Sequence, residues 1–265
     1  MGLRRRSCKN PYISDKFDNP GTDKPINNGN QSITTMEAIV LAGGLGSRLR
    51  PVVSGIPKPM APISNTPFLY YILKWLEYNQ VSRIILSVGY QWEVISKTFG
   101  NRFNDRELIY SVEDSPLGTG GAIALAMDKL IGDSFFIING DTLFKSDLSQ
   151  LFVFHRLGAF DLSILLKPMK HVDRYGTVEV NDHNRVTAFN EKKSQSEGLI
   201  NGGIYLAGKQ IRKHFPATQA FSFEKEFLET KLDELAFGGL ISNSYFIDIG
   251  IPSDYMKAQI ELPNL

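Results

Sequence analysis

The sequence predicts an α/β fold, a Rossmann-like, mostly parallel (mixed) sheet with helices on both faces. Short apolar runs alternate with helical patterns from residue 36 onward, and the first runs are Glu37–Ala42, Arg83–Val88 and Leu108–Val112. They are rich in β-branched residues, as buried parallel strands are. The strand–helix–strand order covers both faces of the sheet. Loops with glycines and charges follow several runs, and ligands of such sheets bind beyond the carboxyl ends of the strands.

The segments between these strands have the apolar spacing of helices. We expect Thr66 to cap a helix over Pro67–Gln80, with proline at the first helical position. A shorter helix is predicted over Gln91–Phe99. Thr119 is expected to cap a third helix that ends near Leu130.

After Leu157 the pattern changes to short extended runs separated by polar turns, which predicts more mixed strand directions. One helix is expected over Phe221–Lys231, capped by Ser222, and a last helix over Ser253–Glu261. The expected strands of this part are Leu162–Leu166, Gly176–Val180, Val186–Asn190, Ile200–Leu206 and Phe237–Ile241.

Residues 1–35 differ in composition from the rest of the chain. They are rich in Asn, Asp, Lys, Pro and Gly and have no apolar periodicity, which predicts a disordered tail. The run Arg4–Arg6 is not followed by the apolar core of a signal peptide. We therefore expect a single domain over residues 36–265.

The composition argues against several classes of partner. The net charge of +1 gives no electrostatic reason to expect nucleic acid or an anionic membrane. No apolar run approaches the roughly 20 residues that span a bilayer. The one cysteine, Cys8, cannot form an internal disulfide, which fits a reducing compartment, so the sequence predicts a cytoplasmic protein.

The segment Met36–Met60 carries the strongest chemical motif, MEAIVLAGGLGSRLRPVVSGIPKPM. The pair Gly43–Gly44 ends the first strand and Gly46 follows, so bare backbone N–H groups are open to a charged ligand. Arg48 and the proline-flanked Lys58 add two cations. A glycine turn followed by fixed cations suits a polyphosphate.

Two commoner glycine motifs do not fit this segment. No lysine followed by Ser or Thr completes the P-loop pattern G-x-x-x-x-G-K-[ST]. The dinucleotide fingerprint G-x-G-x-x-G fails because Leu49 stands where the third glycine belongs. The plainer alternative, a glycine-rich surface turn with solvated arginines, does not explain the three glycines, Arg48 and Lys58 together.

The pattern LAGGLGSRLRP…PKPM resembles the signature of the sugar-1-phosphate nucleotidylyltransferases, and the resemblance runs from Met36 to Leu265. It implies the nucleotide-diphospho-sugar transferase type of fold. It also implies a nucleotide-binding half, residues 36–158, and a sugar-binding half, residues 159–265. Further matching motifs are SVGY at Ser87–Tyr90, EDSPLGTGGA at Glu113–Ala122, INGD at Ile138–Asp141, RYGTVE at Arg174–Glu179, FNEK at Phe189–Lys192, LINGGIY at Leu199–Tyr205 and YFIDIGIPSDY at Tyr245–Tyr255.

The resemblance implies a reaction in which a sugar 1-phosphate attacks the α-phosphorus of an NTP and pyrophosphate leaves. Arg48 would offset the charge on the leaving pyrophosphate, and Lys58 would bridge the two reacting phosphates. Such chemistry is mostly positioning and charge stabilisation, so it needs no side-chain nucleophile. The residues implied for nucleotide binding are Leu41, Ala42, Gly43, Gly44, Gly46, Glu113, Gly118 and Asp141.

Glu113, which the resemblance places at the base, also indicates which base is bound. Guanine offers two adjacent N–H donors on one edge, and a carboxylate can accept both. Uracil and thymine present one donor flanked by carbonyls, which suits an amide better. Glu113 therefore favours GTP, and UTP or dTTP stay open because backbone groups can also read bases.

Two aspartates are candidates for a Mg²⁺ site. Asp141 follows the apolar strand Phe135–Asn139 and a glycine, a common way to place a metal ligand beside phosphates. Asp248 lies in the apolar run Tyr245–Gly250, where a buried charge needs a metal or a salt-bridge partner. The resemblance selects the metal, because both residues match the magnesium-binding aspartates of the family.

The resemblance also implies a sugar site and an acceptor. It favours D-glycero-α-D-manno-heptose 1-phosphate, for surface polysaccharide synthesis, with GTP as the donor. Mannose or another hexose 1-phosphate, with GTP, UTP or dTTP, is the alternative. The residues implied for sugar binding are Tyr175, Gly176, Glu191, Lys192, Asn201 and Gly202.

Two other function classes fit less well. Glycosyl transfer from a nucleotide sugar usually needs two aspartates one residue apart, but Thr142 and Leu143 follow Asp141. A nucleotide-sugar sensor or assembly module on the same fold would tend to lose the cations or metal-binding acids, which this chain keeps. No coiled coil or repeat fixes an oligomeric state, so a homo-oligomer stays open.

Overall fold

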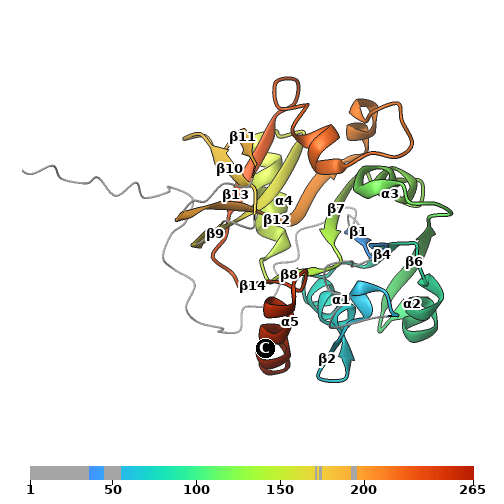
Figure 1. Cartoon of the computed structure of the whole chain (residues 1–265). Coiled ribbons are helices and arrows are strands. Elements are labelled where there is room, and N and C mark those ends of the chain that lie inside the picture. The colour runs from blue at the N-terminus through green and yellow to red at the C-terminus, as the bar shows by residue number, and fades with distance from the viewer. Residues whose placement is uncertain (1–35, 45–54, 171, 173–174, 192–195) are drawn as a thin grey trace, which may run out of the picture. The chain divides into compact units, whose positions relative to one another are not determined.

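A mixed sheet of ten strands forms the centre of the structure (Figure 1). The structure is a computed structural model that describes residues 36–44, 55–170, 172, 175–191 and 196–265 of the 265-residue chain. These residues belong to one compact unit, Thr34–Leu265. The predicted tail, residues 1–35, lies outside the described residues.

Four parallel strands lie side by side in the middle of the sheet, in the order β7 (Ser134–Asn139), β1 (Glu37–Leu41), β4 (Arg83–Val88) and β6 (Arg106–Val112). The chain passes from β1 to β4 and β6 and then returns to β7 on the other side of β1. The connections therefore leave β1 and β7 in opposite directions. This reversal opens a crevice at the carboxyl ends of the strands, where ligands of such sheets bind.

The strands of the second half join this parallel centre through β12, which pairs antiparallel with β7, β9 and β10. β10 pairs with β11, and β13 runs parallel to β9. Two short pairs, β2–β3 and β8–β14, lie outside the large sheet. The bounds are β2 Pro62–Ile63, β3 Thr66–Pro67, β5 Arg102–Phe103, β8 Thr142–Phe144, β9 Leu162–Lys170, β10 Thr177–Val180, β11 Val186–Asn190, β12 Glu197–Gly208, β13 Phe237–Ile241 and β14 Phe246–Asp248.

Helices cover both faces of the sheet, which is therefore buried on both sides (Figure 1). In β1, Ala38 and Val40 contribute to one hydrophobic core and Ile39 to the other, as the two-residue period of a strand requires. The first core contains α1 (Phe68–Tyr78), α2 (Trp92–Phe99), α4 (Leu148–Gly158) and α5 (Pro252–Glu261). The second contains α3 (Gly118–Met127), η2 (Lys209–His214) and the π-helix η3 (Phe223–Leu228). Two short 3₁₀ turns are η1 (Lys58–Met60) and η4 (Leu262–Asn264).

The predicted fold class is confirmed, but the expected start of the first helix is wrong. Thr66 does not cap α1, and Pro67 stands at the N-cap position instead of the first helical position; both residues form β3, which pairs with β2. The helix begins at Phe68, whose N–H donates to the Ala61 carbonyl over 3.0 Å. Backbone pairing with a neighbouring strand has replaced the local cap.

The expected capping role of Thr119 is also wrong. α3 begins at Gly118, and the Thr119 hydroxyl bonds outside its own helix. It donates to the Glu224 carboxylate over 2.9 Å and accepts the Phe223 N–H over 2.8 Å. Thr119 therefore fastens α3 to η3. Ser222 caps η3 as predicted, through the Lys225 N–H, but the helix ends at Leu228 instead of Lys231.

The amino end of β1 is anchored by a buried charge. Glu37 is 0% exposed, and its carboxylate accepts the Ile131 N–H over 2.9 Å and the Gly132 N–H over 2.6 Å. It also pairs with Arg83 over 2.7 Å. This contact joins β1, β4 and the loop before β7.

We expect Glu37→Ala to lower the free energy of unfolding by about 3 kcal/mol, because a buried cation and two N–H groups lose their acceptor. Urea denaturation measures the change. Glu107→Ala is the matched control, because Glu107 pairs with the same Arg83 over 3.0 Å but its side chain is 53% exposed. The control should lose less than about 1 kcal/mol. Equal losses would contradict the importance of the buried pair.

Candidate active site

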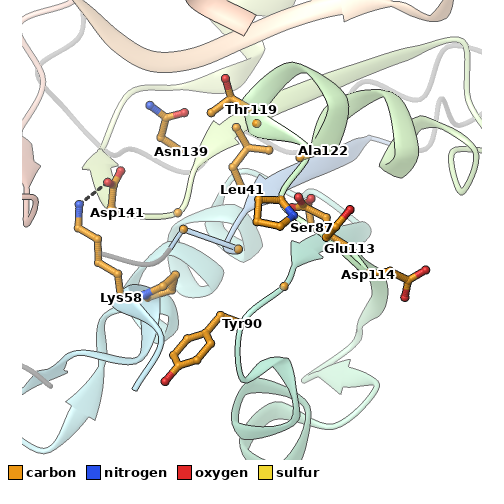
Figure 2. Close-up of a pocket in the computed structure, with 18 of the residues that line it drawn as sticks. Leu41, Lys58, Ser87, Tyr90, Glu113, Asp114, Thr119, Ala122, Asn139 and Asp141 are labelled. Carbon is orange, nitrogen blue, oxygen red and sulfur yellow. Dashed lines mark hydrogen bonds and ion pairs between the residues drawn. The ribbon is translucent and has the colours of Figure 1, made fainter. Parts of the chain in front are cut away.

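A cavity of about 710 Å³ lies at the carboxyl ends of the parallel strands (Figure 2). Its walls come from the loops that follow β1, β4, β6 and β7, together with η1, α3 and η3. This is the crevice that the reversal of strand order creates. The cavity volume is in the range of pockets that hold small organic ligands.

Most of the predicted nucleotide and catalytic residues meet in this cavity. The predicted residues that line it are Leu41, Gly43, Gly44, Lys58, Glu113, Gly118 and Asp141. Ala42 does not line the cavity; it is 1% exposed, and its N–H donates to the Ser87 carbonyl over 2.7 Å. Gly46 and Arg48 lie outside the described residues.

One end of the cavity is closed by Glu113, where β6 ends. A Cβ on Gly43 would stand 2.9 Å from Glu113 Oε1 and 3.2 Å from the Gly89 nitrogen, so only glycine lets the ends of β1, β4 and β6 come together here. Glu113 Oε2 accepts the Leu117 N–H over 2.9 Å. Burial raises the pKa of the Glu113 carboxyl, and the Leu117 N–H opposes this shift.

The other end of the cavity carries the cation Lys58, which forms an ion pair with Asp141 (Figure 2). The proline-flanked segment folds into η1, and the Lys58 side chain is only 9% exposed. Asp248 reaches the same place because β14 pairs with β8, and the Ile249 N–H donates to the Asp141 carbonyl over 3.0 Å. A Cβ on Gly250 would stand 2.7 Å from Asp248 Oδ1 and 3.2 Å from Lys58 Nζ, so both groups lie against that glycine.

The charges at this end are not balanced. Burial, and next the negative charge of Asp141, raise the pKa of the Asp248 carboxyl, while Lys58 and the Gly250 N–H lower it. In the described part of the site, two carboxylates share one ammonium, so a further cation would stabilise their ionised forms. Among the described residues no group of three or more His, Cys, Asp or Glu side chains could hold a metal. Two carboxylate ligands suit Mg²⁺, which usually takes one or two carboxylates and completes its shell with waters and phosphate oxygens.

The predicted sugar-binding residues that the structure describes do not line the cavity; they gather at one end of β10. Thr177 pairs with Asn190 of β11 and with Ile200 of β12. This register places Gly176 beside Glu191 and near Asn201, and a Cβ on Gly176 would stand 2.8 Å from the Asn190 carbonyl oxygen. Lys192 lies outside the described residues.

Aromatic contacts connect this second cluster to the two aspartates. The Tyr175 ring stands edge-on to Phe246, with centroids 6.5 Å apart, and Phe246 lies two residues before Asp248. Phe246 in turn stands edge-on to Phe144 at 5.5 Å. A Cβ on Gly202 would stand 2.5 Å from the Phe144 ring. The described members of the cluster therefore adjoin the β8–β14 pair that carries the aspartates.

The cavity also contains side chains that the sequence does not predict. Asn139 ends β7 directly before Gly140-Asp141, and Ser87 is the one polar residue after Arg83 in the strand Arg83–Val88, so both positions carry a signal in the sequence. Glu224 carries none, because η3 reaches the cavity only through tertiary packing. The further lining residues include Tyr90 and Asp114.

Comparisons with known proteins agree with this arrangement. The family model described as nucleotidyl transferase matches residues 37–264. The chain belongs to the nucleotidyl transferase family. The predicted nucleotide-diphospho-sugar transferase fold is confirmed by structures of this family, and no helix in the described parts of the chain is long and apolar enough to cross a membrane.

Relatives within the nucleotidyl transferase family match over most of the chain. D-glycero-α-D-manno-heptose 1-phosphate guanylyltransferase of Aneurinibacillus thermoaerophilus is 53% identical, over 86% of this chain and 98% of the relative. The enzyme of the same name from Campylobacter jejuni is 44% identical, over 83% of this chain and 97% of the relative. The crystal structure of HddC from Yersinia pseudotuberculosis in complex with GMP-PN has a TM-score of 0.76 and 38% identity, covering 86% of this chain and 99% of that one.

Gly118 offers a test of the cavity wall. Its φ of +68° is left-handed, and a Cβ would stand 2.6 Å from the Phe221 carbonyl oxygen, which already accepts the Gly120 N–H over 2.9 Å. We expect Gly118→Ala to lower the free energy of unfolding by about 2–4 kcal/mol in urea denaturation. Gly55→Ala is the control, because Gly55 has a φ of +77° with nothing within 4 Å. It should lose only the left-handed penalty, about 1–2 kcal/mol; equal losses would show that the contact with Phe221 is unimportant.

Proposed function

We propose that this chain transfers GMP from GTP to D-glycero-α-D-manno-heptose 1-phosphate, giving a GDP-sugar and pyrophosphate. The observation that carries the proposal is the convergence of Glu113 and the Lys58–Asp141 pair on one cavity at the strand ends. The guanylyltransferase relatives, and the HddC structure in complex with GMP-PN, support both the nucleotide and the acceptor. The single cysteine of the chain suits the cytoplasm as the site of the reaction.

In this proposal the two ends of the cavity have separate tasks. The Glu113 carboxylate accepts the two adjacent N–H donors of guanine, and Gly118 lets the base lie against backbone. The backbone of Gly43 and Gly44 faces the phosphates, and Arg48 meets the leaving pyrophosphate. Lys58 donates to the α-phosphate and to the attacking sugar phosphate, holding the two in line.

Asp141 and Asp248 would hold Mg²⁺ near Lys58. The ion, when bound, neutralises charge on the two phosphates that are to be joined. The role of the chain is to hold Asp248 against Gly250 and Asp141 in its ion pair with Lys58. Residues 36–158 would thus form the nucleotide-binding half. Residues 159–265 would form the sugar-binding half, with Tyr175, Gly176, Glu191, Lys192, Asn201 and Gly202 at the acceptor.

Release of pyrophosphate tests the proposal directly. Purified protein is incubated with Mg²⁺, each of the four nucleoside triphosphates, and heptose, mannose or glucose 1-phosphate in turn. We expect the highest kcat/KM for GTP with the heptose 1-phosphate. Preference for mannose 1-phosphate would identify the alternative hexose activity, and no pyrophosphate with any pair would overturn enzymatic function.

Substitution of Lys58 or Asp141 tests the catalytic assignment in the same assay. We expect Lys58→Ala and Asp141→Asn each to lower kcat by about a hundredfold or more, because each removes charge stabilisation worth several kcal/mol in the transition state. Lys74→Ala is the control: among the described residues Lys74 forms an ion pair with Glu77 alone, at the exposed surface of α1. Near wild-type turnover of either active-site variant at saturating Mg²⁺ would contradict its role.

The raised pKa of Glu113 predicts a pH dependence of nucleotide binding. Only the ionised carboxylate can accept both guanine donors, so affinity for GTP should fall as the pH drops through the pKa of Glu113. Because burial raises that pKa, the fall should begin at a higher pH than an ordinary glutamate near 4.3 would give. The stability of the ligand-free protein changes in the opposite direction. Between the ordinary pKa of glutamate and the raised pKa of Glu113, the unfolded chain binds fewer protons than the folded one, so the free energy of unfolding falls as the pH rises.

Calorimetric titration with GTP from pH 4.5 to 7.5 checks this expectation. Glu113→Gln serves as the control, since its amide does not titrate and the remaining pH dependence then reports the phosphates and the other titrating groups of the site, Asp248 among them. Identical profiles for the two proteins would show that Glu113 does not bind the base in its ionised form.

A further inference from the structure

One charged residue of the cavity has no place in the function described above. Glu224, on η3, lines the cavity together with Thr119 and Asn139. An ionised carboxylate accepts hydrogen bonds but donates none, and it repels phosphate oxygens. In a cavity that receives phosphates, such a group is tolerated where the ligand presents N–H or O–H donors.

Hydrogen bonds hold Glu224 in place at the cavity wall. The Thr119 hydroxyl donates to Glu224 Oε2 over 2.9 Å, and the Ser222 hydroxyl donates to the same oxygen over 3.4 Å. The Thr119 hydroxyl accepts the Phe223 N–H over 2.8 Å, which fixes its orientation. Both of these donors approach Oε2, which orders the carboxylate; among the described residues no donor to Oε1 is found, so this oxygen can meet a donor from a ligand.

The position of Glu224 separates it from the base. Figure 2 shows Thr119, its partner, on the same side of the cavity as Asn139 and away from Glu113. Asn139 is followed directly by Gly140 and Asp141, where the acceptor phosphate is expected. Glu224 therefore lies on the acceptor side of the cavity.

A second connection leads from Glu224 to the predicted sugar residues. Tyr205 is fully buried. Burial, and next the negative charge of Glu224, raise the pKa of Tyr205 well above the ordinary value. Tyr205 therefore stays protonated, and its hydroxyl accepts the Asn201 side-chain N–H over 2.8 Å. Asn201 is one of the residues that the resemblance assigns to the sugar, so the charge of Glu224 acts on the same buried hydroxyl that Asn201 contacts.

We propose that Glu224 is a specificity-determining residue for the acceptor, whose carboxylate accepts hydrogen bonds from hydroxyl groups of the sugar 1-phosphate. This inference rests on the proposed function and adds a contact from η3. Thr119 acts as a positioning residue, since it orders the carboxylate of Glu224. The sugar is thus held from two sides, by η3 and by the β10–β12 cluster.

Glu224→Gln tests the proposal, because the amide keeps an oxygen for Thr119 but loses the negative charge. We expect the KM for the acceptor to rise about tenfold or more, the loss typical of a hydrogen bond to a charged group, with the KM for GTP within twofold of wild type. Glu226→Gln is the matched control. Glu226 lies on the same helix, is exposed and does not line the cavity, and in the described contacts its side chain accepts only the Ser222 N–H. Its KM for the acceptor should not change.

Three outcomes would overturn the proposal: a higher KM for GTP with an unchanged KM for the acceptor, no change in either, or a rise in both with a lower Tm. The first assigns Glu224 to the nucleotide and the last to structure. All constants are compared with wild-type protein on the acceptor it turns over fastest. If the proposed function is wrong, wild-type protein releases no pyrophosphate, and this result is distinct from any effect of the Glu224 substitution.

Discussion

The parallel pairing of β1 between β4 and β7 is the constraint on which the candidate site depends. Leu41, the last residue of β1, stands in register with Ser87 on one side and Asn139 on the other. Each strand therefore ends at the same level and releases its loop into one crevice. The buried Glu37 secures the opposite end of β1, so the register is fixed at the bottom of the sheet while the top stays open for a ligand.

A local excess of negative charge follows from that geometry. The pairing of β8 with β14 brings Asp248 to Asp141, and a single ammonium, that of Lys58, lies between them among the described residues. The repulsion between the two carboxylates lowers the stability of the folded protein, and a bound divalent cation would offset this effect. The phosphates of a substrate add further negative charge, so cation, substrate and protein stabilise one another only when all are present. This coupling is what a metal-assisted transfer between two phosphates needs.

The parts of the site that follow buried strands can be predicted from the sequence. Glu113 and Asp141 each come directly after an apolar run, and the carboxyl ends of parallel strands must meet. Lys58 was predicted from its proline frame, but its ion pair bridges 83 residues and has no local pattern. Helix starts failed where tertiary contacts took the capping group, as Thr119 bonds to Glu224, 105 residues away. The backbone pairing of Thr66 shows the same effect at α1.

The contact between α3 and η3 therefore has more than a structural meaning. A threonine at the N-cap would satisfy N–H groups of its own helix, but Leu117 stands at the N-cap of α3 and Thr119 is the second residue of the helix. The Thr119 hydroxyl instead bonds to a residue from the second half of the chain, and α3 begins without a side-chain cap. One N–H group in the first turn of α3, that of Gly120, is satisfied by the Phe221 carbonyl instead. The bond from Thr119 orders a carboxylate at the cavity wall. This order favours the binding of a ligand that donates to the carboxylate, since an ordered acceptor loses less entropy on binding.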